Sequence, residues 1–253
     1  MNRFEEFTTR IVQQVGKKEG PISPVMVNSA SFGYGNSETG EGIFDGSVKK
    51  PLYARVGNPT SAQLEQILAS MDGGIGAIAT SSGMGATAMA TLSLLKAGDE
   101  IISIGGLFGG TYSYFSETLA RFGSTTHFFD VDELDAIEET INTATKILFL
   151  ESVGNPNMRL PDIAKIADIA NRYGVVLMVD NTITPLSVVP IALGADIVVY
   201  STTKIITGNA SSLGGAVIFR AISEGEDKFK GDRYRDVHPF IKKMGSMALV
   251  ANA

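Results

Sequence analysis

A lysine follows directly after an apolar run that predicts a buried strand. The run covers residues 197–200, and Ser201, Thr202, Thr203 and Lys204 come next. Because an ammonium group is costly to desolvate, a lysine in this position needs an explanation. One explanation is an amine bonded covalently to a cofactor aldehyde, with the neighbouring hydroxyl groups holding the cofactor's phosphate. The alternative is a lysine at a strand end that extends into water, as most charged residues do.

A second candidate binding segment lies between the predicted strand 75–80 and the helix after it. Residues 80–85 read Thr-Ser-Ser-Gly-Met-Gly and lead into the helix, with Gly83 and Met84 just before its expected start. The backbone N–H groups and dipole of a helix start favour an anion. The segment also contains a weak dinucleotide-binding pattern, but the next strand does not end in the acidic residue which that interpretation requires. An oxidoreductase therefore remains only a minor alternative.

Three other predicted strands also end in residues that could contact a ligand. Phe108 or Tyr112 follows the strand 100–104, where an aromatic ring could cover a flat ligand, although Phe108 could equally belong to the core. Asn155 follows another strand. Asp180 follows a third, where it could hold a ligand or cap the next turn.

These strand ends together supply a phosphate cradle, an aromatic cover, a carboxamide, a carboxylate and a lysine. The combination suits pyridoxal 5′-phosphate. The lysine would bond to its aldehyde, the carboxylate would keep the pyridine nitrogen protonated, and the aromatic ring would stack on the cofactor ring. No single residue is specific for this cofactor, so the prediction depends on the whole set.

The elements that must position these residues alternate between helix and strand from residue 58 onward. Ligands of such sheets collect at the carboxyl ends of the strands. We expect an α/β fold with a mainly parallel seven-stranded sheet and helices on both faces. The predicted strands cover residues 75–80, 100–104, 125–129, 146–150, 175–179, 197–200 and 216–219, and helices are expected over 59–72, 85–96, 111–122, 134–141 and 162–173.

Three segments are expected along the chain. Residues 1–57 show little periodicity and predict an irregular arm that docks on a neighbouring subunit, since its aromatic residues would otherwise be exposed. Residues 58–220 form the cofactor-binding domain. Residues 221–253 begin as a charged stretch and are expected to start a connection to a C-terminal domain that this chain does not contain.

Composition narrows the classes of partner. The chain has 253 residues, a net charge of -6 and no cysteine. The negative charge argues against nucleic acid, and no apolar run is long enough to span a membrane. The N-terminus does not resemble a secretory signal, so a cytoplasmic location is expected. The two histidines, His127 and His238, lie far apart without a supporting cluster, so no metal site is expected.

In these motifs, the chain resembles the pyridoxal-phosphate enzymes of cysteine and methionine metabolism. This trans-sulfuration family includes cystathionine γ-synthase and lyases, methionine γ-lyase and O-acetylhomoserine sulfhydrylase. The resemblance implies the large domain of pyridoxal-phosphate fold type I. The matching segments occur in family order over nearly the whole chain, at residues 53–60, 81–84, 107–112, 151–158, 179–182 and 201–204.

The resemblance also implies roles for individual residues. Lys204 would carry the cofactor and move protons, while Asp180 would pair with the pyridine nitrogen and Asn155 would contact the cofactor hydroxyl and the substrate. Tyr53 and Arg55 would reach the cofactor phosphate of a neighbouring subunit, which implies a dimer or tetramer. The residues expected to hold the phosphate within the chain are Gly83, Met84, Ser201 and Thr203.

Departures from the family pattern point to one branch. Phe108 stands where the family usually has tyrosine, so it can stack but cannot donate a proton to a leaving thiolate. The segment after Lys204 is closer to the sulfhydrylases. We therefore expect γ-replacement on an O-acylhomoserine, such as O-acetylhomoserine, with sulfide or a thiol, giving homocysteine or methionine. The alternatives are a methionine or cystathionine γ-lyase and a truncated, inactive cofactor-binding remnant.

Overall fold

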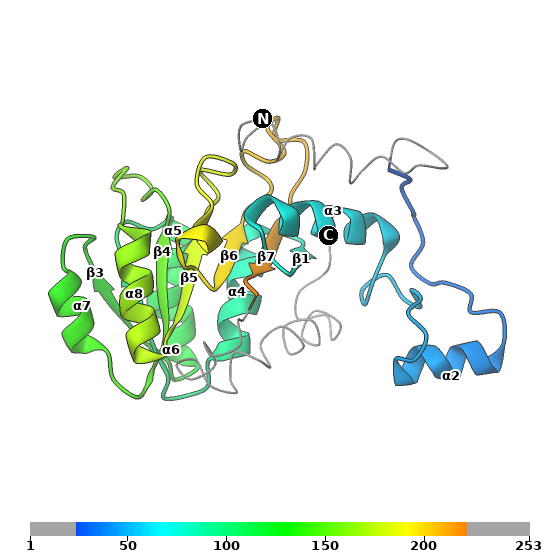
Figure 1. The fold of residues 1–253 in the computed structure, drawn as a ribbon, viewed down its shortest axis with the longest axis horizontal. Coiled ribbons are helices and arrows are strands. Elements are labelled where there is room, and N and C mark those ends of the chain that lie inside the picture. The colour runs from blue at the N-terminus through cyan, green and yellow to red at the C-terminus, as the bar shows by residue number, and fades with distance from the viewer. Residues whose placement is uncertain (1–23, 222–253) are drawn as a thin grey trace.

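The computed structural model describes residues 24–221, which form a seven-stranded sheet flanked by helices (Figure 1). The predicted tail 221–253 therefore lies outside the described residues except for its first position. The strands are β1 (Gly76–Thr80), β2 (Glu100–Ile104), β3 (Thr125–Phe129), β4 (Thr145–Glu151), β5 (Val176–Asp180), β6 (Ile197–Tyr200) and β7 (Gly215–Phe219). The α-helices are α2 (Ser37–Asp45), α3 (Pro59–Asp72), α4 (Gly83–Leu94), α5 (Gly109–Ser113), α6 (Leu119–Arg121), α7 (Leu134–Thr140) and α8 (Ile163–Tyr173). A π-helical turn, η1 (Tyr114–Thr118), and a 3-10 turn, η2 (Pro190–Leu193), complete the elements.

The strand order in the sheet is β1-β7-β6-β5-β4-β2-β3. Strands β6, β5, β4, β2 and β3 are parallel, whereas β7 is antiparallel to both β1 and β6. The predicted mainly parallel seven-stranded sheet is therefore confirmed. Because the parallel strands share a direction, the residues that follow β2, β4, β5 and β6 meet along one edge of the sheet.

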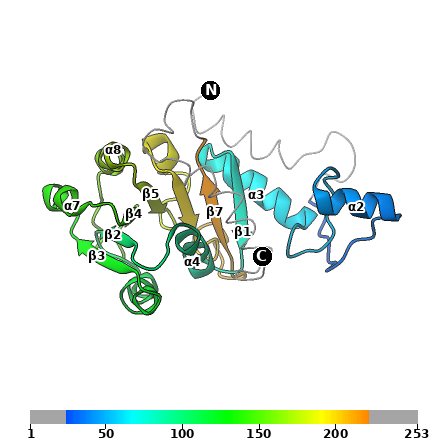
Figure 2. The same ribbon diagram turned by 90° about the horizontal axis from the view of Figure 1, so that it is seen from below.

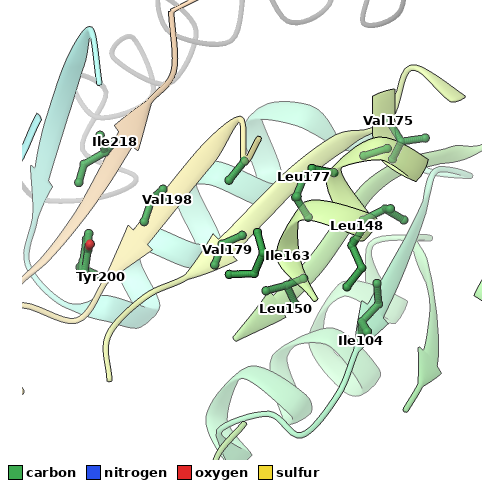
Figure 3. Packing of buried hydrophobic residues seen from close by; sticks show 14 of the residues in the cluster. Ile104, Leu148, Leu150, Ile163, Val175, Leu177, Val179, Val198, Tyr200 and Ile218 are labelled. Carbon is green, nitrogen blue, oxygen red and sulfur yellow. The ribbon is translucent and has the colours of Figure 1, made fainter. Parts of the chain in front are cut away.

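Helices cover both faces of the sheet, and each face has its own apolar core. Figure 2 shows α3 and α8 on one side of the sheet and α4 on the other. On the first side, α8 packs its buried isoleucines against strand residues such as Leu148, Leu177 and Val198 (Figure 3). On the second, Met89 of α4 and Phe115 of the π-helical turn pack against Phe149 and its neighbours. Burial on both faces explains why the central strands are apolar throughout.

Local sequence signals account for the ends of the helices. Asn58 accepts a hydrogen bond from the backbone N–H of Thr60, and Pro59 follows at the first helical position of α3. Gly73 ends that helix with φ 72°, a left-handed conformation that glycine adopts without a steric penalty. These signals position the C-terminal turn of α3 next to the buried end of β6.

The predicted irregular arm is wrong for residues 37–45, which form helix α2. Asn36 accepts the N–H of Thr39, and Gly46 ends the helix with φ 84°. Gly40 and Gly42 inside the helix lower its intrinsic propensity, which is why the sequence indicated a loop. A side chain at Gly42 would lie 2.7 Å from Val48, so the close return of the chain requires glycine there. Figure 1 shows α2 projecting away from the sheet beyond α3.

Within residues 24–221, no helix combines the length and the apolar character needed to cross a bilayer.

A buried polar network lies behind the edge where the strands end. The hydroxyl of Tyr200 donates to Asp72 Oδ1 at 3.1 Å and accepts from Asn181 Nδ2 at 2.7 Å. Thr184 donates to Asn181 Oδ1 at 2.8 Å, and its hydroxyl also contacts that of Ser152 at 2.8 Å. The network ties the last turn of α3 to the ends of β4, β5 and β6.

The carboxyl of Asp72 makes this network sensitive to pH. Burial raises the pKa of Asp72 from 3.8 to about 7, although the hydrogen bond from Tyr200 acts in the opposite direction. Between these values the folded state binds more protons than the unfolded state, so stability falls as pH rises. Asp72→Asn keeps an acceptor for Tyr200 and removes the ionisation.

We predict that the wild type loses about 2 kcal/mol of stability relative to Asp72→Asn between about pH 5 and about pH 8. Urea unfolding of the cofactor-free chain at both pH values measures this difference. Glu151 titrates in both proteins, so its contribution cancels in the comparison. Parallel stability curves for the two proteins would contradict the prediction.

Candidate active site

The start of α4 forms an anion cradle against the turn after β6. The Ser82 side chain caps the helix by accepting the Gly85 N–H at 3.0 Å, while the N–H groups of Gly83 and Met84 have no partner in the described part of the chain. A Cβ on Gly83 would lie 2.5 Å from that of Ser201, so only glycine permits this approach. The structure therefore brings together three of the four residues predicted to hold a phosphate, and their donors suit an anion.

Asp180 ends β5 at the same edge. Its Oδ1 accepts the backbone N–H of Thr182 at 2.9 Å, and the Thr182 hydroxyl also bonds to it. That hydroxyl accepts the N–H of Ser201 at 2.8 Å. Burial raises the pKa of Asp180, and the two hydrogen bonds from Thr182 lower it to a smaller extent. Thr182 thus joins the carboxylate at β5 to the cradle at β6, a role that the sequence did not reveal.

Lys204 lies in the turn after β6 and is exposed. Its backbone N–H donates to Ser201 O at 3.3 Å, and its carbonyl accepts the Gly208 N–H at 2.8 Å. No hydrogen bond or ion pair holds its amine among residues 24–221, so the amine is available to a ligand. Thr203 differs from the prediction in its present contacts: its hydroxyl lies 3.2 Å from Gly214 O and 3.0 Å from Gly214 N. To bind a phosphate, this hydroxyl would have to leave the Gly214 carbonyl.

Glu151 is a second residue whose role the sequence did not reveal. It is 6% exposed, and its Oε1 accepts the backbone N–H of Phe108 at 2.6 Å. The register of β4 and β5 sets Glu151 beside Asp180. Burial, and to a smaller extent the charge of Asp180, raises the pKa of Glu151 to about 7. The backbone N–H groups of Phe108 and Asn155 act in the opposite direction. The sequence signal was available, since Glu151, like Asp180, is a carboxylate after an apolar strand.

The two candidate aromatic residues have different surroundings in the structure. Phe108 precedes α5 and is 50% exposed, with its ring beside Gly110, where a Cβ would lie 2.6 Å from the ring. The ring of Tyr112 instead lies against that of Phe128 in β3, with the centroids 4.9 Å apart and the ring planes tilted by 40°. Phe108 therefore remains the aromatic candidate at the strand ends.

Asn155 lies in an exposed loop after β4 that is packed against the loop after β2. The Asn157 amide lies between the two loops, because a Cβ on Gly106 or Gly154 would approach it to 2.6 or 2.4 Å. The Gly154 N–H also donates to the carbonyl of Arg159 at 2.9 Å, which closes the loop. The structure thus places Asn155 and Phe108 on adjoining loops.

Tyr53 and Arg55 belong to the segment before α3 and not to the strand ends that carry the other predicted site residues. Both are exposed on the arm before α3, and the Arg55 guanidinium lies 4.8 Å from the centre of the Tyr53 ring. The arm is attached to the domain by the N–H of Val27, which donates to Thr60 at 2.9 Å, and by Asn58, which donates to Val27 O at 3.0 Å.

In the described range 24–221, no cluster of three or more His, Cys, Asp or Glu side chains could hold a metal ion.

Comparisons with known proteins agree with this arrangement. The model of the Cys/Met metabolism PLP-dependent enzyme family matches residues 8–250, so the chain belongs to that family. A methionine γ-lyase of Pseudomonas putida is 35% identical over 86% of this chain and 56% of its own length. An O-acetyl-L-homoserine sulfhydrylase of Corynebacterium glutamicum is 37% identical over 85% of this chain and 50% of its own. This chain thus spans about half the length of these curated relatives.

A solved structure shows the same fold. It is a provisionally assigned O-acetylhomoserine (thiol)-lyase of Campylobacter jejuni that carries N′-pyridoxyl-lysine-5′-monophosphate. The match has a TM-score of 0.81 and 31% identity, and it covers 90% of this chain and 60% of that one. The fold class is therefore the large domain of pyridoxal-phosphate fold type I, as predicted. Enzymes of the family depend on pyridoxal phosphate.

We predict that Thr182→Val destabilises the protein by about 1–3 kcal/mol relative to Thr182→Ser, since it leaves the Ser201 N–H and Asp180 without the hydroxyl. Urea unfolding of the cofactor-free variants measures the difference. Serine serves as the control because it keeps the hydroxyl and loses only a methyl group. Equal stability of the valine and serine variants would show that the bridge contributes nothing.

Proposed function

We propose that this chain binds pyridoxal phosphate covalently through Lys204 and catalyses γ-replacement on an O-acylhomoserine, such as O-acetylhomoserine. Sulfide or a thiol would be the second substrate, giving homocysteine or methionine. The observation that carries the proposal is the arrangement at the sheet edge. Lys204 lies exposed after β6, and Thr182 links Asp180 to the turn that begins at Ser201.

The residues present fit this cofactor. The free N–H groups of Gly83 and Met84 at the start of α4 suit its phosphate. Asp180 suits its ring nitrogen, because a protonated nitrogen would offset the desolvation that raises the pKa of this carboxyl. Ser201 and Thr203 add hydroxyl groups beside the cradle, and Asn155 adds a carboxamide on the adjoining loop.

When bound, pyridoxal phosphate supplies an electron sink for negative charge on the substrate's α-carbon. Lys204 Nζ would hold the cofactor through its aldehyde and would serve as the general base that removes the α-proton and later returns a proton. Asp180 would place a negative charge toward the ring nitrogen. Phe108 would cover the ring and exclude water from the site.

Phe108 favours an ester substrate over a thioether. A phenyl ring offers no hydroxyl to protonate a leaving thiolate, whereas acetate leaves readily without such help. The similarity to the Corynebacterium sulfhydrylase and a homocysteine synthase of Schizosaccharomyces pombe, 41% identical over 75% of this chain and 45% of its own length, supports this choice. The methionine γ-lyase similarity supports γ-elimination as the second candidate.

The partner in this proposal is a second copy of the chain, in a dimer or tetramer. Tyr53 and Arg55 are exposed on an arm that projects beyond α3, so they could reach the phosphate of a neighbouring subunit (Figure 1). The apolar side chains Met26, Tyr34 and Phe44 on this arm are 85%, 46% and 79% exposed, and docking would bury them.

Turnover by the 253-residue chain tests the proposal. We expect homocysteine from O-acetylhomoserine and sulfide in the presence of pyridoxal phosphate, and none from Lys204→Ala. Release of ammonia and a 2-oxo acid from methionine, without homocysteine formation, would favour the γ-lyase. A chain that binds the cofactor and converts neither substrate would support the inactive remnant.

We further predict that Phe108→Tyr leaves the dissociation constant for pyridoxal phosphate within about twofold, because the ring still stacks, and increases ammonia release from methionine. A spectroscopic titration and an ammonia assay measure the two effects. Loss of cofactor binding in this variant would show that Phe108 does not lie over the ring.

A further inference from the structure

The Glu151 side chain contacts both loops that carry candidate residues of the site. Its Oε1 accepts the Phe108 N–H at 2.6 Å, and the backbone N–H of Asn155 lies close enough to the same carboxyl to lower its pKa. Both loops are contacted from the last residue of β4, in the interior of the sheet. The carboxyl is therefore attached to a rigid element, while the residues that it holds stand on loops.

Burial makes the contact with Phe108 hard to replace. Glu151 is 6% exposed, so water does not compete efficiently for its oxygens, and a buried N–H that loses its acceptor is costly. Phe108 is half exposed and Asn155 exposed, so other contacts restrain them less.

We propose that Glu151 is a positioning residue that sets the spacing between the Phe108 ring and Asn155, because it accepts the backbone N–H of Phe108 from one loop and lies beside that of Asn155 on the other. The proposal deepens the proposed function, because these two residues are its ring cover and its contact to the cofactor hydroxyl. The structure gives Glu151 no direct role with a substrate; it acts through the two loops. Asn157, which lies between the same loops, supplements it by packing.

Two substitutions distinguish the effect of the length of the Glu151 side chain from the effect of its charge. Glu151→Asp keeps the charge but shortens the side chain by one methylene, so its carboxyl no longer reaches the Phe108 N–H. Glu151→Gln keeps the length and one acceptor oxygen for that N–H, and loses the charge. Glu100→Asp is the matched control, since Glu100 begins β2 at the opposite edge of the sheet.

The chain contains no tryptophan, so Phe108→Trp introduces a single fluorescent reporter at the position of interest. Acrylamide quenching and anisotropy of this reporter in the cofactor-free full chain measure how firmly the loop is held. We expect Glu151→Asp to increase quenching and lower anisotropy, and Glu151→Gln and Glu100→Asp to leave both near the parent values.

The affinity for pyridoxal phosphate is the second readout, measured with Phe108 intact. We expect Glu151→Asp to weaken binding about tenfold, the equivalent of one lost hydrogen bond, and Glu151→Gln to weaken it less. If Glu151→Gln has the larger effect in both readouts, the residue acts through its charge and the proposal is overturned. No effect of either variant on the reporter also overturns it.

Failure of the proposed function is distinguishable from failure of this inference. If the parent chain does not bind pyridoxal phosphate, the proposed function fails. The reporter in the cofactor-free chain still tests the contacts of Glu151 in that case.

Discussion

The register between β4 and β5 sets two carboxyl groups, Glu151 and Asp180, side by side at the buried edge of the sheet. Like charges so placed cannot both be ionised without compensation, and burial raises the pKa of each. The surrounding groups supply that compensation. The N–H of Phe108 bonds to Glu151 and that of Asn155 lies beside it, and Thr182 bonds to Asp180 through its N–H and its hydroxyl. The loops that carry the candidate site residues are therefore held by the need to solvate two carboxylates.

A second constraint comes from close packing at the neighbouring strand ends. Gly83 allows the start of α4 to touch Ser201, and this contact sets the first turn of the helix against the turn that carries Lys204. Thr182 connects this turn to Asp180. The start of α4, the turn that carries Lys204 and the Asp180 carboxyl are thus held together by the Gly83–Ser201 contact and by Thr182, before any ligand is bound.

The sequence was sufficient for the sheet because its strands are buried on both faces and apolar throughout, and each helix ends at a clear signal such as Gly73 or Gly174. It was insufficient for α2, where two glycines outweighed the Asn36 cap in the pattern. Lys204 and Asp180 were recognisable because charged residues are unusual directly after buried strands, and Gly83 because it lies where a helix begins after a strand. Thr182 was missed because its role depends on contacts between strands, which no local pattern contains. Glu151 was missed although a carboxylate after an apolar strand is a visible signal, because its contact with Phe108 depends on how the loops pack.

The identity of the lysine that bonds to the cofactor is the most direct test of the central claim, that the strand ends assemble a pyridoxal-phosphate site around Lys204. The full chain is mixed with pyridoxal phosphate, its visible spectrum is recorded, and the adduct is reduced with borohydride and located by peptide mass spectrometry. We predict a visible band that is absent from Lys204→Ala, and a pyridoxyl group on Lys204. A pyridoxyl group on other lysines alone, or no adduct at all, would contradict the claim.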